Sequence, residues 1–485
     1  MMVAKPAYLF DRDREWAALS RFANDPRPLA TLGIVSGRRR QGKTFLLSAL
    51  TERVGGWYFA ATEATKEESL RLFGAAIGEQ TGSGPLRFDD WEQAIRHVLQ
   101  LATGKPSTLV IDEFPYLIKS APDLPSLLQR ELDAPAQARH GGMLRLVLCG
   151  SAMSIMGRLL AGTAPLRGRA GLELIVHPLS YRDAAGFWGI SDPKLALLVN
   201  AVVGGTPAYR RQFVRDDAPA DLADYDDWIC RTVLEPTTPL FREARYLLAE
   251  EPDIRDLGIY HSVLAAVALG NRTSGGIAGY VGRKSPEIVH PISVLEDAGL
   301  LRREPDAFAA NRSQYRIIEP LVVFYHAIMR STWTRLELGH ARDVWKESQQ
   351  KFLSQVVGPH FEQVCRAYAT VTPIAGQSPA EVCAGSVHDP TTRQQIRVDV
   401  VVFGDSPPGR PRRVLALGEA KWGKTMGLRH VERLDRAKEL IEAKGFDAAD
   451  ARLMCFSGAG FDEELRARAT GDGRVLLVGS DHLYD

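Results

Sequence analysis

The first 150 residues alternate short apolar runs with longer stretches of mixed polarity. Apolar runs lie at 32–35, 56–59, 108–111 and 144–149, and their length is typical of buried strands. The stretches between them have apolar residues at helical spacing. This alternation predicts an α/β fold in which helices cover a mostly parallel sheet.

The loop after the first apolar run has the pattern GxxxxGK[ST], formed by Gly37, Gly42, Lys43 and Thr44. Backbone N–H groups of such a loop and the following helix N-terminus surround a phosphate. Lys43 would reach the β- and γ-phosphates, and the Thr44 hydroxyl would bind Mg²⁺. A chance match in a Gly/Arg-rich loop is the alternative, but the predicted strand before the loop and helix after it argue against chance. The sequence therefore predicts a site for ATP and Mg²⁺, with these nucleotide-contacting residues: Gly37, Gln41, Gly42, Lys43, Thr44, Phe45 and Asp112.

Two acidic residues end the apolar run at 108–111, as in a Walker B strand. Asp112 would hold Mg²⁺ through water, and Glu113 would act as the general base on the attacking water. Ser151 follows the run at 144–149, where it is either a polar sensor of the γ-phosphate or a simple strand-end cap. The strand predicted between the loop and Asp112 resembles the additional-strand class of P-loop proteins, to which AAA+ ATPases belong.

Further segments resemble, in chain order, the archaeal-type ATPase family of the AAA+/STAND lineage. These segments are LFDRDREWAAL, IDEFPYL, CGSAMSIMGRLLAGTAPLRGR, GGTPAY and YRIIEPLVVFY. The resemblance implies an arginine that senses the γ-phosphate, for which PLRGR offers Arg167 and Arg169; a solvated basic turn is the alternative. It also implies four domains: an AAA+ core at 1–180, a helical lid at 181–250, a winged helix-turn-helix at 251–335 and a restriction-endonuclease-like domain at 336–485.

Two groups of basic residues lie outside the predicted catalytic positions, one in the phosphate loop and one between 258 and 325. The three arginines of the phosphate loop, Arg38, Arg39 and Arg40, are expected to point outward; a role against phosphate or nucleic acid is the alternative. The order of helices and a hairpin between 258 and 325 predicts a winged helix, which would either contact DNA or pack against the lid. The residues that could contact DNA phosphates are Arg283, Lys284, His290, Arg302, Arg303, Arg312 and Arg316.

The C-terminal part carries an acid pair with a lysine. Glu419 and Lys421 end one predicted strand and lie on the same face, because side chains alternate along a strand. Asp399 on a neighbouring strand and Glu362 on a preceding amphipathic helix would complete one site. Carboxylates that share a divalent metal, with a lysine beside the water, suit phosphodiester hydrolysis. This is the PD-(D/E)xK arrangement, although an ExK tripeptide alone is more often a solvated strand end.

The composition argues against several classes of protein. The 485 residues include 60 Lys and Arg against 59 Asp and Glu, for a net charge of +1, so a DNA-binding surface would have to be local. The five cysteines form no CxxC pair, which argues against a disulfide framework or zinc ribbon. No run approaches the length of a membrane span. We therefore expect a cytoplasmic protein without membrane contact.

The leading hypothesis is an ATPase that couples nucleotide binding to a DNA-directed, nuclease-like C-terminal domain and that could form a homo-oligomer. An alternative is a STAND-like switch that binds protein partners and cleaves nothing. A DNA-binding regulator without catalysis is a third reading, which Lys43 and Glu113 argue against.

Overall fold

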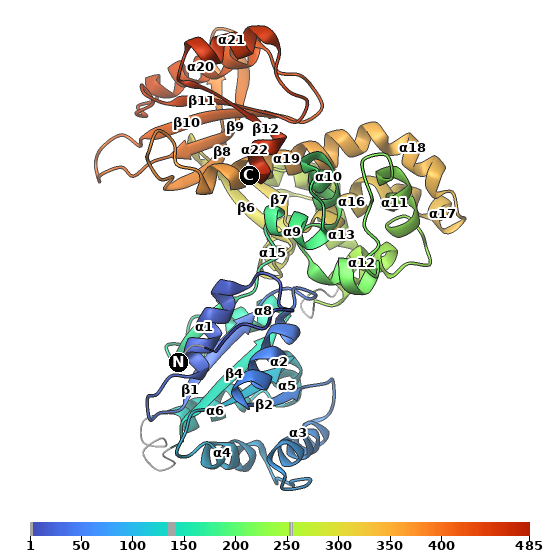
Figure 1. Cartoon of the computed structure of the whole chain (residues 1–485), viewed down its shortest axis with the longest axis vertical. Coiled ribbons are helices and arrows are strands. Elements are labelled where there is room, and N and C mark those ends of the chain that lie inside the picture. Colours follow the sequence, from blue (N-terminus) through green and yellow to red (C-terminus); the bar gives the residue numbers. More distant parts are fainter. Residues whose placement is uncertain (1–2, 134–141, 252–253, 255) are drawn as a thin grey trace.

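The computed structural model describes residues 3–133, 142–251, 254 and 256–485. Two five-stranded sheets lie toward the two ends of the molecule, and a mainly helical region lies between them (Figure 1). None of the helices in the described ranges is long and apolar enough to cross a membrane.

The N-terminal sheet is parallel and has the strand order β2-β3-β4-β1-β5. The strand predicted between the phosphate loop and Asp112 is β2, which pairs with β3 at the edge of the sheet. β4 lies between β1 and β3, which is the strand order of the additional-strand class. The strands are β1 Thr31–Ser36, β2 Trp57–Ala60, β3 Ser107–Asp112, β4 Leu144–Gly150 and β5 Ala170–Ile175. The helices are α1 Asp13–Ala23, α2 Lys43–Val54, α3 Lys66–Thr81, α4 Trp91–Leu101, α5 Phe114–Ser120, α6 Leu124–Leu132 and α8 Met153–Arg158.

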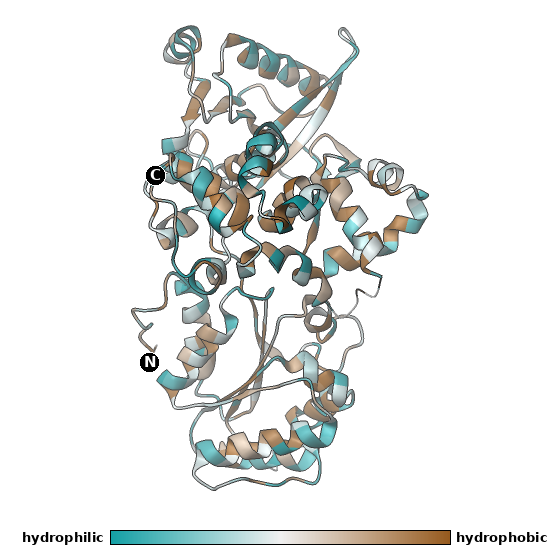
Figure 2. Ribbon diagram, turned by 90° about the vertical axis from the view of Figure 1, so that its right-hand side faces the viewer, coloured by the Kyte–Doolittle hydropathy of each residue, from teal (hydrophilic) through white to brown (hydrophobic). Residues whose placement is uncertain are grey.

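Alternate residues of these strands enter two separate cores. Leu109 and Leu146 pack with the cluster that includes α4 and α6, whereas Val110 and Val147 pack with α1 and α2 on the other face. Both faces of the sheet are therefore buried, which explains why its strands read as continuous apolar runs. Figure 2 shows the matching pattern on the helices, where brown residues alternate with teal ones.

The middle region is helical apart from one hairpin. It begins with α9 Tyr181–Trp188, α10 Pro193–Val203, η1 Tyr209–Phe213, α11 Tyr225–Thr232 and α12 Pro239–Ala249, which we call the lid helices. The elements that follow are α13 Leu257–Ala268, α14 Ser274–Val281, α15 Ser285–Asp297, β6 Leu301–Asp306 and β7 Ala309–Ile317. Then come α16 Pro320–Phe324, η2 Tyr325–Met329, α17 Arg330–Glu337, α18 Ala341–Phe352 and η3 Leu353–Val357.

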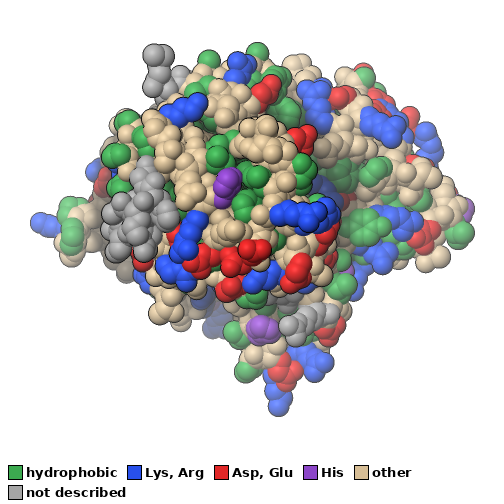
Figure 3. Space-filling view, turned by 90° about the horizontal axis from the view of Figure 1, so that it is seen from below, with side chains coloured by type: hydrophobic (Ala, Val, Ile, Leu, Met, Phe, Trp, Pro, Cys, Tyr) green, Lys and Arg blue, Asp and Glu red, His purple; other side chains and the backbone are tan. Residues whose placement is uncertain are grey.

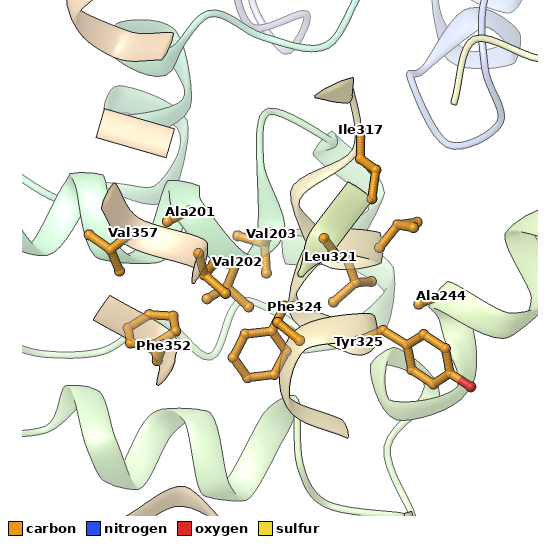
Figure 4. Close-up of a cluster of buried hydrophobic side chains, with 14 of the residues drawn as sticks. Ala201, Val202, Val203, Ala244, Ile317, Leu321, Phe324, Tyr325, Phe352 and Val357 are labelled. Atoms are coloured by element: carbon orange, nitrogen blue, oxygen red, sulfur yellow. The ribbon is translucent and has the colours of Figure 1, made fainter. Parts of the chain in front are cut away.

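One apolar core joins the lid helices to the helices after the hairpin (Figure 4). The rings of Phe324 and Phe352 lie 6.0 Å apart, centroid to centroid, beside Val202 and Val203 of α10. The lid helices thus share buried surface with a segment more than 100 residues further along the chain.

The C-terminal sheet is mixed, with the order β12-β11-β10-β9-β8. β8, β9 and β10 pair antiparallel, and β10, β11 and β12 pair parallel. The elements are α19 Gly358–Val371, β8 Glu381–Asp389, β9 Gln394–Phe403, β10 Val414–Lys421, α20 Leu428–Ala443, β11 Arg452–Ser457, α21 Glu463–Gly471, β12 Val475–Gly479 and α22 Ser480–Tyr484.

The tip of the β6–β7 hairpin docks on this sheet. Ala307 and Phe308 are buried in the core of the C-terminal region. The Ala307 amide donates to the Ala384 carbonyl at 2.9 Å, and the Phe308 ring lies 5.5 Å from that of Phe446. The hairpin therefore connects the middle region to the edge strand β8 instead of projecting into solvent.

We predict that Phe308→Ala lowers the free energy of unfolding by about 3 kcal/mol, because it empties a buried space between hairpin and sheet. Urea titration measures the loss. Tyr280→Ala removes a half-exposed ring from α14 and should change the value by no more than about 0.5 kcal/mol. Equal effects of the two variants would contradict the docking.

Candidate functional site

The phosphate loop joins the end of β1 to the start of α2. Gly37 has φ 150°, and a Cβ there would lie 2.5 Å from the Val176 carbonyl oxygen, so only glycine fits. Gly42, with φ 85°, precedes the first residue of α2. The loop therefore takes the tight course that brings backbone amides around a phosphate.

The Lys43 ammonium lies inside this loop. It donates to the carbonyls of Gly37, at 2.5 Å, and Arg38, at 2.8 Å. The side chain is buried, and burial lowers the pKa of Lys43. A buried cation whose hydrogen-bond partners are neutral carbonyls fits a site for an anion, because a phosphate would compensate the lost hydration.

Thr44 and Asp112 lie side by side at the carboxyl end of the sheet. The Thr44 hydroxyl donates to Asp112 Oδ2 at 2.7 Å, and the Tyr58 hydroxyl donates to the same oxygen at 2.6 Å. Burial acts to raise the pKa of Asp112, but hydrogen bonds from Cys149, Tyr58 and Thr44 outweigh it and lower that pKa. An ionised carboxylate beside a hydroxyl is a donor set that fits Mg²⁺.

Glu113 has a strained backbone at the end of β3. Its φ of 51° is left-handed, which costs a non-glycine residue about 1–2 kcal/mol. The Ser151 hydroxyl lies 3.1 and 3.2 Å from its two carboxylate oxygens. Ser151 therefore holds the predicted general base in place; its role as a sensor of the γ-phosphate stays a prediction.

A cavity of about 970 Å³ opens in front of these residues. Its polar side includes Lys43, Thr44 and Glu113. Gln41, Gly42 and Phe45 of the predicted nucleotide-contacting set also line it, whereas Gly37 and Asp112 of that set do not. Sequence reasoning missed its aromatic and lid-side walls. These walls include Tyr8, Phe10, Phe187, Pro207 and Arg211. Tyr8 lies just before the segment LFDRDREWAAL, Phe10 lies within it and Pro207 lies within GGTPAY, so the quoted motifs held a signal for these walls that was not used.

The three loop arginines do not point outward, which corrects the expectation from the sequence. Arg38 Nη1 lies 2.8 Å from Glu319 Oε2, and Arg40 Nη1 lies 2.8 Å from Glu243 Oε1. These two glutamates are only 2% and 1% exposed. Buried carboxylates need cationic partners, and the loop supplies them to α12 and to the residue before α16.

Arg39 and Arg40 share a second carboxylate. Arg39 Nε lies 3.4 Å and Arg40 Nη1 lies 3.2 Å from Glu250 Oε2, at the end of α12. The phosphate loop is therefore connected directly to the lid helices by ion pairs.

Glu243 should make stability depend on pH. Burial raises its pKa to about 7, although Arg40 acts to lower it. A raised carboxyl pKa favours the folded state at low pH, and this contribution is lost as the pH rises from about 4.5 through about 7. We predict that Glu243→Gln reduces the drop in melting temperature between pH 5 and pH 8. The exposed variant Glu79→Gln should keep the drop of the parent, and an unchanged drop in Glu243→Gln would contradict the assignment.

Arg167 and Arg169 lie away from this cavity. Arg167 is exposed and donates to the Gly162 carbonyl at 2.5 Å. Arg169 Nε lies 2.9 Å from Asp133 Oδ1. Neither is among the residues that line the cavity, so within one chain the predicted sensing arginines do not face the phosphate loop.

In the C-terminal region, the four predicted residues come together. Lys421 Nζ lies 3.0 Å from Glu419 Oε1 and 3.9 Å from Asp399 Oδ2. Arg397 pairs with both Glu362 and Asp399. Burial, and then the neighbouring Asp399, raise the pKa of Glu362. Side chains from α19, β9 and β10 thus converge on one cluster.

Arginines occupy much of this acidic cluster. Arg433 Nη1 lies 2.7 Å from Glu419 Oε1, whereas Glu419 Oε2 is buried without a hydrogen-bond partner within the described part of the chain. That part of the chain also contains no set of three His, Cys, Asp or Glu residues arranged to hold a metal ion. The predicted metal pair is present, but its carboxylates are held by basic side chains.

The basic residues considered for DNA contact have mixed surroundings. Arg302, Arg303 and Arg312 are exposed on the hairpin strands, but Arg316 pairs with Glu304 at 2.6 Å. Exposed Arg283, Lys284 and His290 share their surface with Glu287. Lys and Arg side chains are also interspersed with Asp and Glu on the face seen in Figure 3.

The strand order and the loop between β1 and α2 define a P-loop fold of the additional-strand class. No family model matches the chain. An uncharacterised protein of Methanocaldococcus jannaschii is 24% identical over 339 residues, which are 69% of this chain and 72% of that protein.

Two solved structures of archaeal proteins resemble the chain weakly. A Walker-type ATPase of Pyrococcus abyssi is 18% identical with a TM-score of 0.49, over 67% of this chain and 98% of that one. The ORC2 protein of Aeropyrum pernix, solved as ADPNP–ADP complexes, is 16% identical with a TM-score of 0.42, over 72% and 97%.

Proposed function

We propose that the chain binds ATP together with Mg²⁺ and hydrolyses the nucleotide. The observation that carries this proposal is that Lys43, Thr44 and Glu113 line one cavity, with Asp112 hydrogen-bonded to Thr44 behind it. Lys43 would exchange its two carbonyl partners for phosphate oxygens, and Thr44 with Asp112 would hold the metal. Bound Mg²⁺ would supply neutralisation of phosphate charge. Glu113, oriented by Ser151, would take the proton of the attacking water.

Two substitutions in this cavity should have different effects. Lys43→Ala should weaken ATP binding roughly tenfold or more, because it removes a charged hydrogen-bond donor. Glu113→Gln should keep binding but lower the hydrolysis rate roughly 100-fold or more, because it removes the base. Calorimetry measures binding, and phosphate release measures turnover.

Lys119→Ala and Glu63→Gln are the matched controls, since this lysine and glutamate pair on the exposed surface. Both controls should bind and hydrolyse ATP like the parent. Hydrolysis by Glu113→Gln at the parent rate would show that Glu113 is not the base.

We further propose that the C-terminal cluster binds a divalent metal and acts on a phosphodiester of DNA, in the manner of a restriction-endonuclease-like domain. The buried Glu419 Oε2, which has no hydrogen-bond partner in the described residues, supports this proposal, because it is an acceptor that a divalent cation would satisfy. Lys421, beside both acids, would position or activate the attacking water. Arg302 and Arg303 are exposed on the β6–β7 hairpin, the wing of the predicted winged helix, and would contact the DNA backbone.

Substitutions should separate metal binding by the carboxylates from the role of Lys421 in cleavage. With Mn²⁺, Asp399→Asn should lose metal binding and cleavage of DNA, whereas Lys421→Ala should keep the metal and lose cleavage. Calorimetry with Mn²⁺ and gel assays at low salt with single- and double-stranded DNA test both steps. Asp405→Asn and Lys424→Ala change exposed residues of the C-terminal region and serve as controls.

ATP turnover should survive both substitutions, since the cluster lies in a different sheet from the phosphate loop. A parent protein that binds no Mn²⁺ and cuts no DNA would refute the C-terminal proposal and favour a nucleotide switch that acts on protein partners.

A further inference from the structure

The three loop arginines differ in how firmly they are held. Arg38 and Arg40 pair with Glu319 and Glu243, whose carboxylates are almost completely buried. Removing either arginine from its partner would leave a buried charge uncompensated, which is costly. These two arginines are therefore fixed parts of the contact between loop and lid.

Arg39 has no buried carboxylate as its partner; besides a hydrogen bond with Tyr116, it is held by Glu250. Its ion pair is with Glu250, at 3.4 Å, and both side chains are partly exposed, at 34% and 26%. Glu250 also has Arg40 as a second partner, with Nη1 to Oε2 at 3.2 Å. If Arg39 moved away, Glu250 would keep a cation beside it, so the cost of that movement is small.

Arg39 also lies at the cavity that contains the predicted catalytic residues. It lines the cavity together with Lys43, Thr44 and Glu113. Burial acts to lower the pKa of Arg39, but Glu250, a hydrogen bond with Tyr116 and the charge of Glu113 outweigh it and raise that pKa. Its guanidinium thus stays charged and lines the same cavity as the predicted general base.

Three other arginines line this cavity. Arg12 pairs with Glu15 at 3.0 Å and Arg40 with the buried Glu243, so both are held by carboxylates. Arg211 comes from the lid side, where its guanidinium lies 5.4 Å from the ring centroid of Phe187. It also pairs with Asp216 at 2.9 Å. Arg211 therefore belongs to the aromatic side of the cavity, and Arg39 to the side of the phosphate loop.

We propose that Arg39 contacts the γ-phosphate of ATP bound to its own chain, and that Glu250 is its counter-ion when no γ-phosphate is present. This inference rests on the proposed ATP site. An arginine there stabilises charge on the transferred phosphoryl group. Because Glu250 ends the lid helix α12, the exchange of carboxylate for phosphate releases one contact between loop and lid in response to ATP but not to ADP.

Binding measurements test the contact without relying on turnover. Calorimetry with Mg²⁺ compares a non-hydrolysable ATP analogue with ADP. Arg39→Ala should weaken binding of the analogue roughly tenfold or more, because only the analogue offers a γ-phosphate. The affinity for ADP should stay within about twofold of the parent value. The affinity of Arg39→Lys for the analogue should lie between those of the parent and the alanine variant, since lysine keeps the charge and lacks the planar guanidinium. Exposed Arg71→Ala is the control.

Glu250→Gln tests the counter-ion from the other side. It removes the carboxylate that competes for Arg39, so the analogue should bind several-fold more tightly. The affinity for ADP should not change. This arm remains informative if Arg39→Ala does not fold. Analogue binding that is unchanged or weakened in Glu250→Gln would overturn the counter-ion role.

A mixing experiment tests whether the arginine acts within one chain. Arg39→Ala and Lys43→Ala are each defective in the same pocket, so their mixture should hydrolyse ATP no faster than the two separate proteins. Restored turnover would place the arginine in a neighbouring subunit and overturn the inference.

The failures of the two proposals can be told apart. If the parent binds neither nucleotide, the proposed ATP site is wrong. If the parent prefers the analogue and Arg39→Ala keeps the same preference, the ATP site stands and the inference is wrong. If Arg167→Ala or Arg211→Ala abolishes the preference and Arg39→Ala does not, the sensing arginine is that other residue.

Discussion

The balance between a buried, cationic phosphate loop and the carboxylates around it is the constraint on which the arrangement depends. Lys43 is satisfied by two carbonyls of its own loop, and Arg38 and Arg40 compensate glutamates that are otherwise almost inaccessible to solvent. The loop therefore cannot change its contacts without altering the charge balance of the lid. A polyanion entering the cavity would compete with the carbonyls and carboxylates that now hold the cations.

This charge balance reaches the rest of the molecule through a short series of contacts. Arg38 ties the loop to Glu319, just before α16, and α16 packs in the same core as α10. The hairpin before Glu319 docks its tip on β8 of the C-terminal sheet. The Tyr181 hydroxyl of α9 donates to the Leu483 carbonyl at 2.7 Å, so the last helix α22 returns to the lid. The described contacts thus connect the phosphate loop to the acidic cluster through packed elements.

Local patterns predicted the parts of the fold and site that depend on neighbouring residues. The strands of the parallel sheet, the phosphate loop and the pairing of Thr44 with Asp112 follow from apolar runs and a motif of fixed spacing. The partners of the loop arginines could not be predicted, because Arg38 and Glu319 are 281 residues apart in sequence. The docked hairpin tip had a signal in Phe308, an apolar residue at a turn. Arg397 and Arg433 were missed because nothing in their spacing distinguishes them from solvated arginines.

The central claim is that the cavity beside the phosphate loop is an ATP site. A crystal structure of the full chain with Mg²⁺ and a non-hydrolysable ATP analogue tests it most directly. The account predicts that Lys43 Nζ leaves the Gly37 and Arg38 carbonyls for the β- and γ-phosphates, and that Thr44 and Asp112 face the metal. An analogue bound elsewhere, or a Lys43 that keeps both carbonyl contacts with the nucleotide in the cavity, would contradict it.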